Sequence, residues 1–303
     1  MENIKHLLEK FKAETAKPSI RLVSEWSVDI SAADSKLGGN PYLPKDYPYP
    51  VTAKGEPLKL LAQINFGQMP KLEHFPAEGI LQFFVRFDGT VGMLRDMPTI
   101  EQDTFRVIYH EKILPEEARM TEFLQIPYIK SDGEPSYGYS EEWFPFDADS
   151  EYLLKGSPEN SNIHCCAYEF DDAFAAFCRE NDIYDYFELY FTGIYVEKTA
   201  TKAEYKDFYR KRRQLKRLIF NNFVGGGSRI SGYPAFVQED RRRHIEQLRK
   251  YDTLLLQIDS EIDFNPDEAG ISWGDGGAAN FFINLEDLKR LNFQNVFYTW
   301  DSY

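Results

Sequence analysis

Cysteine is rare in this 303-residue chain, which contains only Cys165, Cys166 and Cys178. An odd, sparse set with one adjacent pair does not make a disulfide framework, so we expect no bridge. No second pair of cysteines or histidines stands at the spacing of a structural zinc site. We therefore expect no metal and no cofactor, and a fold stabilised by its hydrophobic core.

Long apolar runs and excess positive charge are missing as well. No stretch approaches 18 apolar residues, and the N-terminus lacks the basic region and apolar run of a signal peptide. Lys plus Arg total 35 against 49 Asp plus Glu, a net charge of −14. Because nucleic-acid binders carry basic surfaces, nucleic acid is an unlikely partner. We expect a cytoplasmic protein without a membrane partner.

Aromatic side chains are abundant instead, at 16% of the chain, within a hydrophobic total of 43%. Large rings fill layered β cores, so the composition favours extensive sheet. Alternating apolar residues predict a first strand or bent strand pair from Ile20 through Trp26 and Val28 to Ile30. Residues 131–162 are polar and rich in turn formers. Further strands are predicted at 58–66, 80–87, 105–110, 123–129, 186–196, 253–259, 279–283 and 295–300.

Helical periodicity appears in fewer places. A helix begins near Ile4 and ends before Lys17-Pro18, and Phe174, Phe177 and Cys178 face inward on a short helix. Thr201 and Glu204 have the spacing of a capping box, which predicts a helix that ends at the glycines 225–227. Further helices are predicted at 239–250 and after Asn284. The expected fold class is α+β, mainly antiparallel sheet with flanking helices.

Three sequence blocks recur in the same order. Residues 35–43 match 228–236, residues 60–65 match 254–259, and residues 79–85 match 277–283. We interpret this as an internal duplication within one compact unit, 1–303, whose two halves share a core. Repeat one spans about 18–130, an insertion about 131–200, and repeat two about 201–303. A buried amide must be hydrogen-bonded, so Gln63 and Gln257 are expected to brace the loop of their own repeat.

These blocks carry a family resemblance. Leu-Gly-Gly-Asn-Pro-Tyr-Leu-Pro at 37–44, Leu-Leu-Ala-Gln-Ile-Asn at 60–65 and Ile-Ser-Trp-Gly-Asp-Gly-Gly at 271–277 together resemble the YwqG-like family of bacterial proteins. The resemblance covers essentially the whole chain. It implies a duplicated α+β fold, and it implies no activity and no catalytic residue, because that family is uncharacterised.

Several motifs imitate known sites without completing them. Residues 274–279 fit the glycine fingerprint of dinucleotide-binding proteins, but a strand rather than a helix is predicted to follow. The segment after Asp263 imitates a calcium loop without its glycine and closing glutamate. A divalent ion there is less favoured than a solvated acidic loop; its ligands would be Asp259, Glu261, Asp263 and Asp267.

His164, Cys165 and Cys166 form a third incomplete motif, since a nucleophilic cysteine needs a base that sequence alone cannot place. The favoured interpretation is that the two cysteines are small buried residues at the start of a strand.

Charge is segregated along the chain. Residues 200–250 hold 14 Lys or Arg and 5 Asp or Glu, a net of +9, which leaves −23 for the remainder. One hypothesis is an exposed contact surface for an anion or partner protein. The alternative, which such runs usually favour, is a pair of solvated helix faces. The contact surface would consist of Arg210, Arg213, Arg217, Arg241 and Arg242.

Two functional hypotheses follow. The first is a non-catalytic intracellular binding or interaction protein, whose partner is an unidentified protein or anionic ligand. The second is an enzyme, hydrolytic or metal-assisted, with a site in the groove between the repeats where the glycine-rich loops and Asp275 converge. No residue can be designated catalytic from the sequence.

Overall fold

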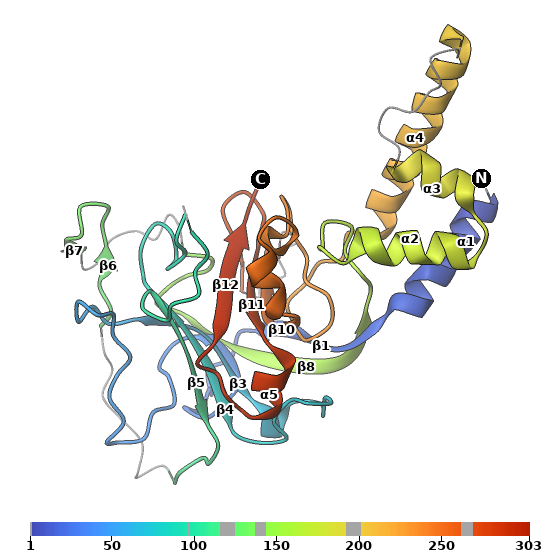
Figure 1. Ribbon diagram of the computed structural model, residues 1–303. Coiled ribbons are helices and arrows are strands. Elements are labelled where there is room, and N and C mark those ends of the chain that lie inside the picture. Colours follow the sequence, from blue (N-terminus) through green and yellow to red (C-terminus); the bar gives the residue numbers. More distant parts are fainter. Residues whose placement is uncertain (1, 96, 116–124, 137–143, 192–200, 262–268) are drawn as a thin grey trace.

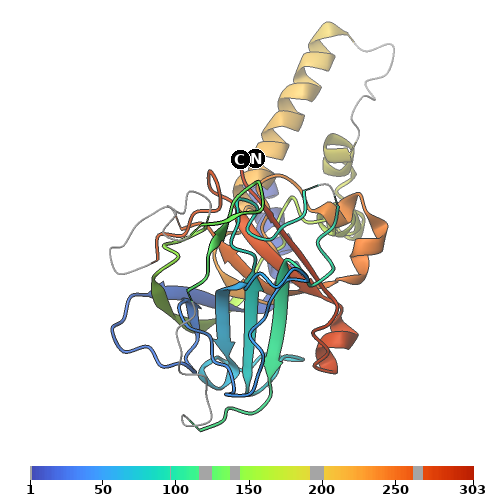
Figure 2. The same cartoon turned by 90° about the vertical axis from the view of Figure 1, so that its left-hand side faces the viewer.

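The computed structural model describes residues 2–95, 97–115, 125–136, 144–191, 201–261 and 269–303. It has two regions, a body built on one large sheet and an arm of helices that projects from it (Figure 1). Strands β1 (Lys17–Glu25) and β8 (Glu151–Ser161) run side by side from the body toward the arm. The same projection is seen after a quarter turn (Figure 2).

The sheet has ten strands in the order β12-β11-β10-β9-β1-β8-β2-β3-β4-β5, and its neighbours pair antiparallel. Two four-strand runs therefore flank the central pair β1 and β8. A separate pair joins β6 (Tyr128–Ile129) to β7 (Pro135–Ser136). The flanking strands are β2 (Lys36–Gly38), β3 (Lys59–Asn65), β4 (Ile80–Val85), β5 (Phe105–His110), β9 (Arg229–Ile230), β10 (Thr253–Asp259), β11 (Ala278–Ile283) and β12 (Val296–Asp301).

The two ends of the sheet curl toward each other, almost into a closed cylinder. Phe83 on β4 and Phe281 on β11 lie with ring centroids 4.9 Å apart, and Phe105 and Tyr298 lie 5.5 Å apart. The Tyr298 N–H donates to the Thr99 carbonyl at 2.9 Å. The inner faces of the two runs therefore form one core, as expected for a mainly antiparallel α+β protein.

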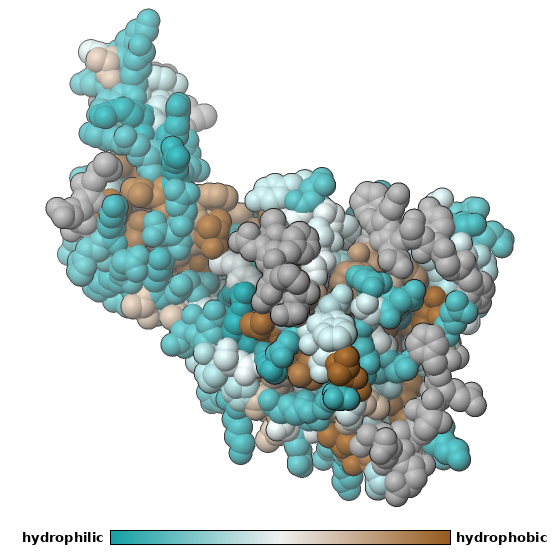
Figure 3. All heavy atoms as spheres, turned by 180° about the vertical axis from the view of Figure 1, so that it is seen from behind, coloured by the Kyte–Doolittle hydropathy of each residue, from teal (hydrophilic) through white to brown (hydrophobic). Residues whose placement is uncertain are grey.

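The arm consists of α1 (Glu2–Thr15), α2 (Phe170–Glu180), α3 (Tyr184–Phe191) and α4 (Lys202–Asn222). Phe11 of α1 is fully buried, and its ring centroid lies 5.0–5.8 Å from four other phenylalanine rings. Hydrophobic side chains gather where these helices meet, beneath a hydrophilic outer surface (Figure 3). Three distant parts of the sequence thus share a second core.

Short helices complete the structure. α5 (Leu285–Lys289) begins at Asn284, whose side chain accepts the Glu286 N–H, as the sequence predicts. The capping box of Thr201 and Glu204 is confirmed at the start of α4. Within the described residues, the body also has the 3-10 helices η1 (Phe66–Gln68), η3 (Arg241–Arg243) and η4 (Glu246–Lys250). The single helix predicted at 239–250 is therefore wrong, because it is two short turns, η3 and η4.

The predicted first strand is too long. β1 ends at Glu25, and Trp26 and Val28 are 57% and 75% exposed. Although they alternate with polar residues, these two side chains do not pack on a core, because pairing with β8 stops at Glu25. Of the strand predicted at 123–129, the structure has only β6; residues 123 and 124 lie outside the described residues.

Two predictions in the middle of the chain are wrong. Residues 186–191 belong to helix α3 rather than a strand, because their aromatic rings pack against the helical core of the arm. Residues 192–196 of that prediction lie outside the described residues. The polar segment 151–161 is not turn but β8, which pairs with β1 over residues 153–161 and with β2 over residues 151–153. Backbone pairing, rather than burial of its side chains, defines this strand.

Candidate functional site

A polar network lies under the loops that cover β3 and β4. Because Phe83 faces the core, its neighbour Gln82 points to the outer face of the sheet. The Gln63 Oε1 accepts the Tyr42 N–H at 2.8 Å, and its Nε2 donates to two carbonyls of the loop before β2, each at 2.8 Å. The Gln82 Nε2 donates to Gln63 Oε1 at 2.8 Å and to the Tyr42 carbonyl at 2.5 Å. Gln63 therefore fixes the loops on both sides of β2.

His110 closes this first network. Its Nε2 lies 3.1 Å from the Gln82 Oε1, an acceptor, so the ring nitrogen donates. The rings of Tyr42 and Tyr47 contact His110 edge-on, with centroids 5.3 and 4.9 Å away. Burial lowers the pKa of His110 to about 4, so the ring is neutral at physiological pH. The side-chain amides of Gln63 and Gln82 thus have partners at both the oxygen and the nitrogen.

A second network lies in the matching place over β10 and β11. The Gln257 Oε1 accepts the Ala235 N–H at 2.6 Å, and its Nε2 donates to the Gly227 carbonyl at 2.8 Å. Asn280, next to Gln257 in the sheet, donates from Nδ2 to the Ala235 carbonyl at 3.0 Å. Asn280 is 0% exposed, so water does not reach its Oδ1, and this oxygen has no hydrogen-bond partner among the described residues.

Asp301 occupies the position on β12 that His110 occupies on β5, opposite the first residue of the neighbouring strand. Its Oδ2 accepts the N–H groups of Val237 and Gln238 at 2.9 and 2.7 Å. Its Oδ1 is buried and has no partner among the described residues. Burial raises the pKa of this carboxyl from 3.8 to about 6.

Asn280 and Asp301 both line a pocket of about 550 Å³, which we call the Asp301 pocket. Residues 90–95 form one wall, residues 236–244 another, and strands β11 and β12 the floor. Arg241 joins the walls by donating to the carbonyls of Arg95 and Met97, at 3.0 and 3.3 Å. The Trp300 Nε1 donates to the Thr90 carbonyl at 2.7 Å and holds the floor to the first wall.

His164, Cys165 and Cys166 form a thiol cluster in the turn after β8. One nitrogen or sulfur atom from each lies within 4.8 Å of the others, and the Cys166 N–H donates to His164 Nδ1 at 3.1 Å. Hydrogen bonds from Cys165 and His164 lower the pKa of Cys166 to about 5, while the first of these bonds and burial raise the pKa of Cys165. The prediction of buried residues at a strand start is wrong, because both cysteines are partly exposed and follow a strand.

The thiol cluster lies near the Asp301 pocket. The charges of Cys166 and His164 act on the pKa of Asp301, the first raising it and the second lowering it. Cys166 also packs against the apolar cluster that contains Phe236, a residue of the pocket wall. A base, a thiol and a carboxyl that are far apart in the sequence are thus gathered in one part of the body.

The five arginines of the expected contact surface are separated. Arg242 is 1% exposed and lies against the fully buried Asp240, with Nε–Oδ1 and Nη2–Oδ2 distances of 3.0 and 2.8 Å. Its Nη1 donates to the Tyr251 carbonyl at 2.9 Å. An arginine committed to a buried ion pair cannot meet a partner, so the prediction for Arg242 is wrong. Arg241 is half-buried at the Asp301 pocket.

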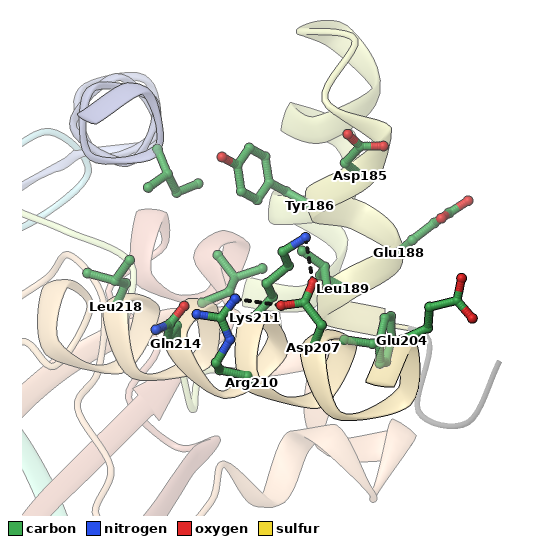
Figure 4. Close-up of a pocket in the computed structure, with 13 residues that line it drawn as sticks. Asp185, Tyr186, Glu188, Leu189, Glu204, Asp207, Arg210, Lys211, Gln214 and Leu218 are labelled. Atoms are coloured by element: carbon green, nitrogen blue, oxygen red, sulfur yellow. Dashed lines mark hydrogen bonds and ion pairs between the residues drawn. The ribbon is translucent and has the colours of Figure 1, made fainter. Parts of the chain in front are cut away.

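The remaining three, Arg210, Arg213 and Arg217, are exposed on α4. A hollow of about 720 Å³ lies between α3 and α4, and Figure 4 shows Asp207 between Arg210 and Lys211 on its α4 side. The Asp207 carboxylate pairs with both cations, at 2.5 and 2.8 Å. Asp185 and Glu188 of α3 also line the hollow, so its charge is mixed.

The other motifs give no site among the described residues. Asp259 accepts the N–H groups of Gly227 and Ser260, and Asp263 and Asp267 lie outside the described residues. The glycines at 274–277 lead into strand β11, so no dinucleotide-binding turn is formed. Asp275 is exposed in that turn and does not line the Asp301 pocket.

The fold and pocket define a protein of mixed helix and sheet, in which two strand runs of one curled sheet each carry a polar network. The chain belongs to a family described as a domain of unknown function, DUF1963, whose model matches residues 35–302. Among curated proteins no significant match was found. No helix in the described part of the chain is long and apolar enough to cross a membrane.

Proposed function

We propose that this is a binding protein whose Asp301 pocket holds a small polar molecule that presents N–H or O–H donors. The observation that carries the proposal is the unpaired Asn280 Oδ1. This acceptor atom has no hydrogen-bond partner among the described residues, and it belongs to a buried side chain of a residue that lines the pocket. A buried acceptor without a donor costs about 1–3 kcal/mol. A hydrogen-bond donor of the ligand that reaches Asn280 Oδ1 offsets that cost, and this favours binding.

Asp301 narrows the ligand class. Its Oδ1 is a second unpartnered acceptor, and a carboxyl with a pKa of about 6 is mostly charged at neutral pH. A primary ammonium group satisfies both a negative charge and two acceptors, whereas a carboxylate satisfies neither. Trp300 and Phe236 supply aromatic surface for the apolar part of the ligand. The volume of about 550 Å³ lies within the usual range for small-molecule sites.

The test replaces one atom of the pocket. Asp301→Asn keeps an oxygen for the N–H groups of Val237 and Gln238 and turns the unpartnered oxygen into an NH₂ donor. Wild type and variant are compared by native mass spectrometry against primary amines, polyols and carboxylic acids of matched size. Amines are expected to bind wild type and to lose at least about tenfold in affinity for the variant.

The matched control is Asp275→Asn, which removes the same charge from an exposed turn outside the pocket. It is expected to bind amines as wild type does. Amine binding that survives Asp301→Asn, or falls equally in both variants, would refute the pocket as the binding site.

A second candidate function is hydrolysis at the thiol cluster beside the Asp301 pocket. The observation that favours it is the proximity of the His164–Cys166 pair to Asp301, because a thiolate beside a histidine is a competent acyl-transfer nucleophile. A panel of small thioesters, esters and amides is the test. Turnover that Cys166→Ser abolishes supports the enzyme, and binding without turnover leaves the first proposal standing.

We also propose that the two strand runs arose by duplication. Support comes from their order, with β2 to β5 beside β8 and β9 to β12 beside β1, and from a register shift at Leu60/Ala62 that recurs at Leu254/Leu256. The resemblance to the YwqG-like family and a cytoplasmic location belong to the same proposal. An experimental structure in which residues 35–110 fail to superpose on 228–301 would refute the duplication, and cell fractionation tests the location.

A further inference from the structure

The three thiols of the chain have three different environments. Cys178 is fully buried on α2, and burial raises its pKa to about 11. Cys165 is partly exposed, but its hydrogen bond to Cys166 and burial raise its pKa and keep it protonated. Cys166 is partly exposed and is the one whose pKa is lowered. Only Cys166 therefore combines access with a thiolate at neutral pH.

The thiolate is held by a built arrangement of neighbours. Cys165 donates to it from the preceding position, and the His164 ring is fixed by the Cys166 N–H at 3.1 Å. The sulfur and nitrogen atoms of the three residues lie within 4.8 Å of one another. Arg243 adds a positive charge nearby, and it is anchored by its bond to the Ala167 carbonyl at 3.0 Å.

We propose that Cys166 is a thiol–disulfide exchange site, at which the Cys166 sulfur attacks a low-molecular-weight disulfide and retains one half of it as a mixed disulfide. This exchange reaction does not require a ligand in the Asp301 pocket. In the exchange, a bond forms between Cys166 Sγ and one sulfur of the reagent while the reagent's own S–S bond breaks. The electron pair leaves with the second sulfur, which takes a proton from solvent. Cys166 is oxidised to the disulfide level, and half of the reagent is reduced to a thiol.

No second cysteine of the chain can attack the mixed disulfide and release the adduct. Adjacent residues have Cα atoms about 3.8 Å apart, shorter than the roughly 4.4–6.8 Å that a disulfide spans, so Cys165 does not displace the adduct. Cys178 is fully buried within the core of the arm and cannot reach it. The product is therefore one adduct per chain. It is easily removed by an external thiol, because a low-pKa thiolate is a good leaving group.

The test uses the full chain and oxidised glutathione at neutral pH, followed by intact mass and peptide mapping. One glutathione adduct is expected on the peptide that carries Cys166, and dithiothreitol should remove it. Cys178→Ser is the matched control and should still gain one adduct. Cys165→Ser should also gain one adduct, because serine can replace the donated hydrogen bond. Cys166→Ser should gain none.

Two further measurements test the Cys166 thiolate itself. The ultraviolet thiolate absorbance of wild type should titrate below pH 7, and this transition should be absent from Cys166→Ser. His164→Gln should slow adduct formation about tenfold or more, since it removes the hydrogen bond and the charge of His164 that favour the Cys166 thiolate. The hydrogen bond from Cys165 and the charge of Arg243 remain, and Asp301 is the carboxyl on which Cys166 in turn acts. An adduct mapped to Cys165 or Cys178 in wild type, or no adduct with oxidised glutathione, would overturn the proposal.

Discussion

The two polar networks of the sheet begin alike and end differently. Gln63 and Gln257 are both fully buried, and each fixes a covering loop through its side-chain amide. Beyond them, the first network continues through Gln82 to His110, while the second stops at Asn280. Asparagine is one methylene shorter than glutamine, and the Asn280 Oδ1 reaches no partner in the described part of the chain.

This comparison shows where a shared scaffold can acquire a site. In the first network, the rings of Tyr42 and Tyr47 lie against His110 and close the surface. In the second network, the equivalent surface is hollowed into the Asp301 pocket. The glutamines fix a covering loop in both networks, and Gln82 lies in the closed network whereas Asn280 lines the Asp301 pocket.

The largest expected effect comes from breaking the networks at their glutamines. Gln63→Leu removes the acceptor of the Tyr42 N–H, one of the two acceptors of Gln82 Nε2 and the donor to two loop carbonyls. We expect a loss of about 3–5 kcal/mol in the free energy of unfolding, measured by urea denaturation. Gln257→Leu leaves the Ala235 N–H unpaired and removes one of two donors from the Gly227 carbonyl, which keeps Arg229 Nε at 3.3 Å, so about 1–3 kcal/mol is expected.

The control for this pair is Gln214→Leu on the exposed surface of α4, which should change stability by less than about 0.5 kcal/mol. A loss in Gln257→Leu that equals or exceeds that of Gln63→Leu would contradict the bond counts.

An intermediate effect is expected from acid, and its sign differs between the networks. The pKa of His110 is lowered to about 4, so the unfolded chain binds a proton first and stability falls as pH drops from about 6.5 to 4. The pKa of Asp301 is raised to about 6, so the folded chain binds a proton first and stability rises as pH drops from about 6 to 4. In wild type the two contributions, about 2–3 kcal/mol each, largely cancel.

Single substitutions separate these contributions. His110→Gln should make the protein gain stability as pH falls from 6 to 4, and Asp301→Asn should make it lose stability over the same range. Urea midpoints at several pH values measure both slopes. Slopes of the same sign in the two variants would show that the networks do not oppose each other.

The smallest expected effect on stability comes from Asn280→Gln, which gives the second network the longer amide of the first. The extra methylene extends toward the pocket, so we expect a change of less than about 1.5 kcal/mol in unfolding free energy. Amine binding by the Asp301 pocket should nevertheless fall, because the added atoms occupy ligand space. Isothermal titration with the amines that bind wild type measures this, and undiminished affinity would place the ligand elsewhere.

Local signals in the sequence predicted the elements whose form is decided locally. The capping box at Thr201, the cap at Asn284 and the apolar strands β10 and β11 are examples. β8 could not be predicted in this way, because in its strand register only Leu153 pairs with both β1 and β2, and the rest of the strand tolerates polar residues and Pro158. α3 was missed because its aromatic residues favour strands locally, and only packing in the arm selects the helix.

The candidate sites were predictable only in part. The polar residues Gln63 and Gln257 stood out within apolar strands. Asp301 gave no signal, because its importance comes from burial under residues 237 and 238 rather than from a motif. The arginine run at 241–243 was misleading for the opposite reason. It reads as a solvated patch, but Asp240 lies fully buried beside Arg242 and draws that side chain inward.

The make-up of the arm sets an order of events during synthesis. α1 precedes its partners α2, α3 and α4 by roughly 150 residues or more, and Ile4, Leu8 and Phe11 share a core with residues of those later helices. At roughly 5–20 residues per second, the first helix leaves the ribosome about 8–30 s before its partners exist. During that interval its apolar face is open to chaperones, and only the pairing of β8 with β1 brings the later helices back to cover it.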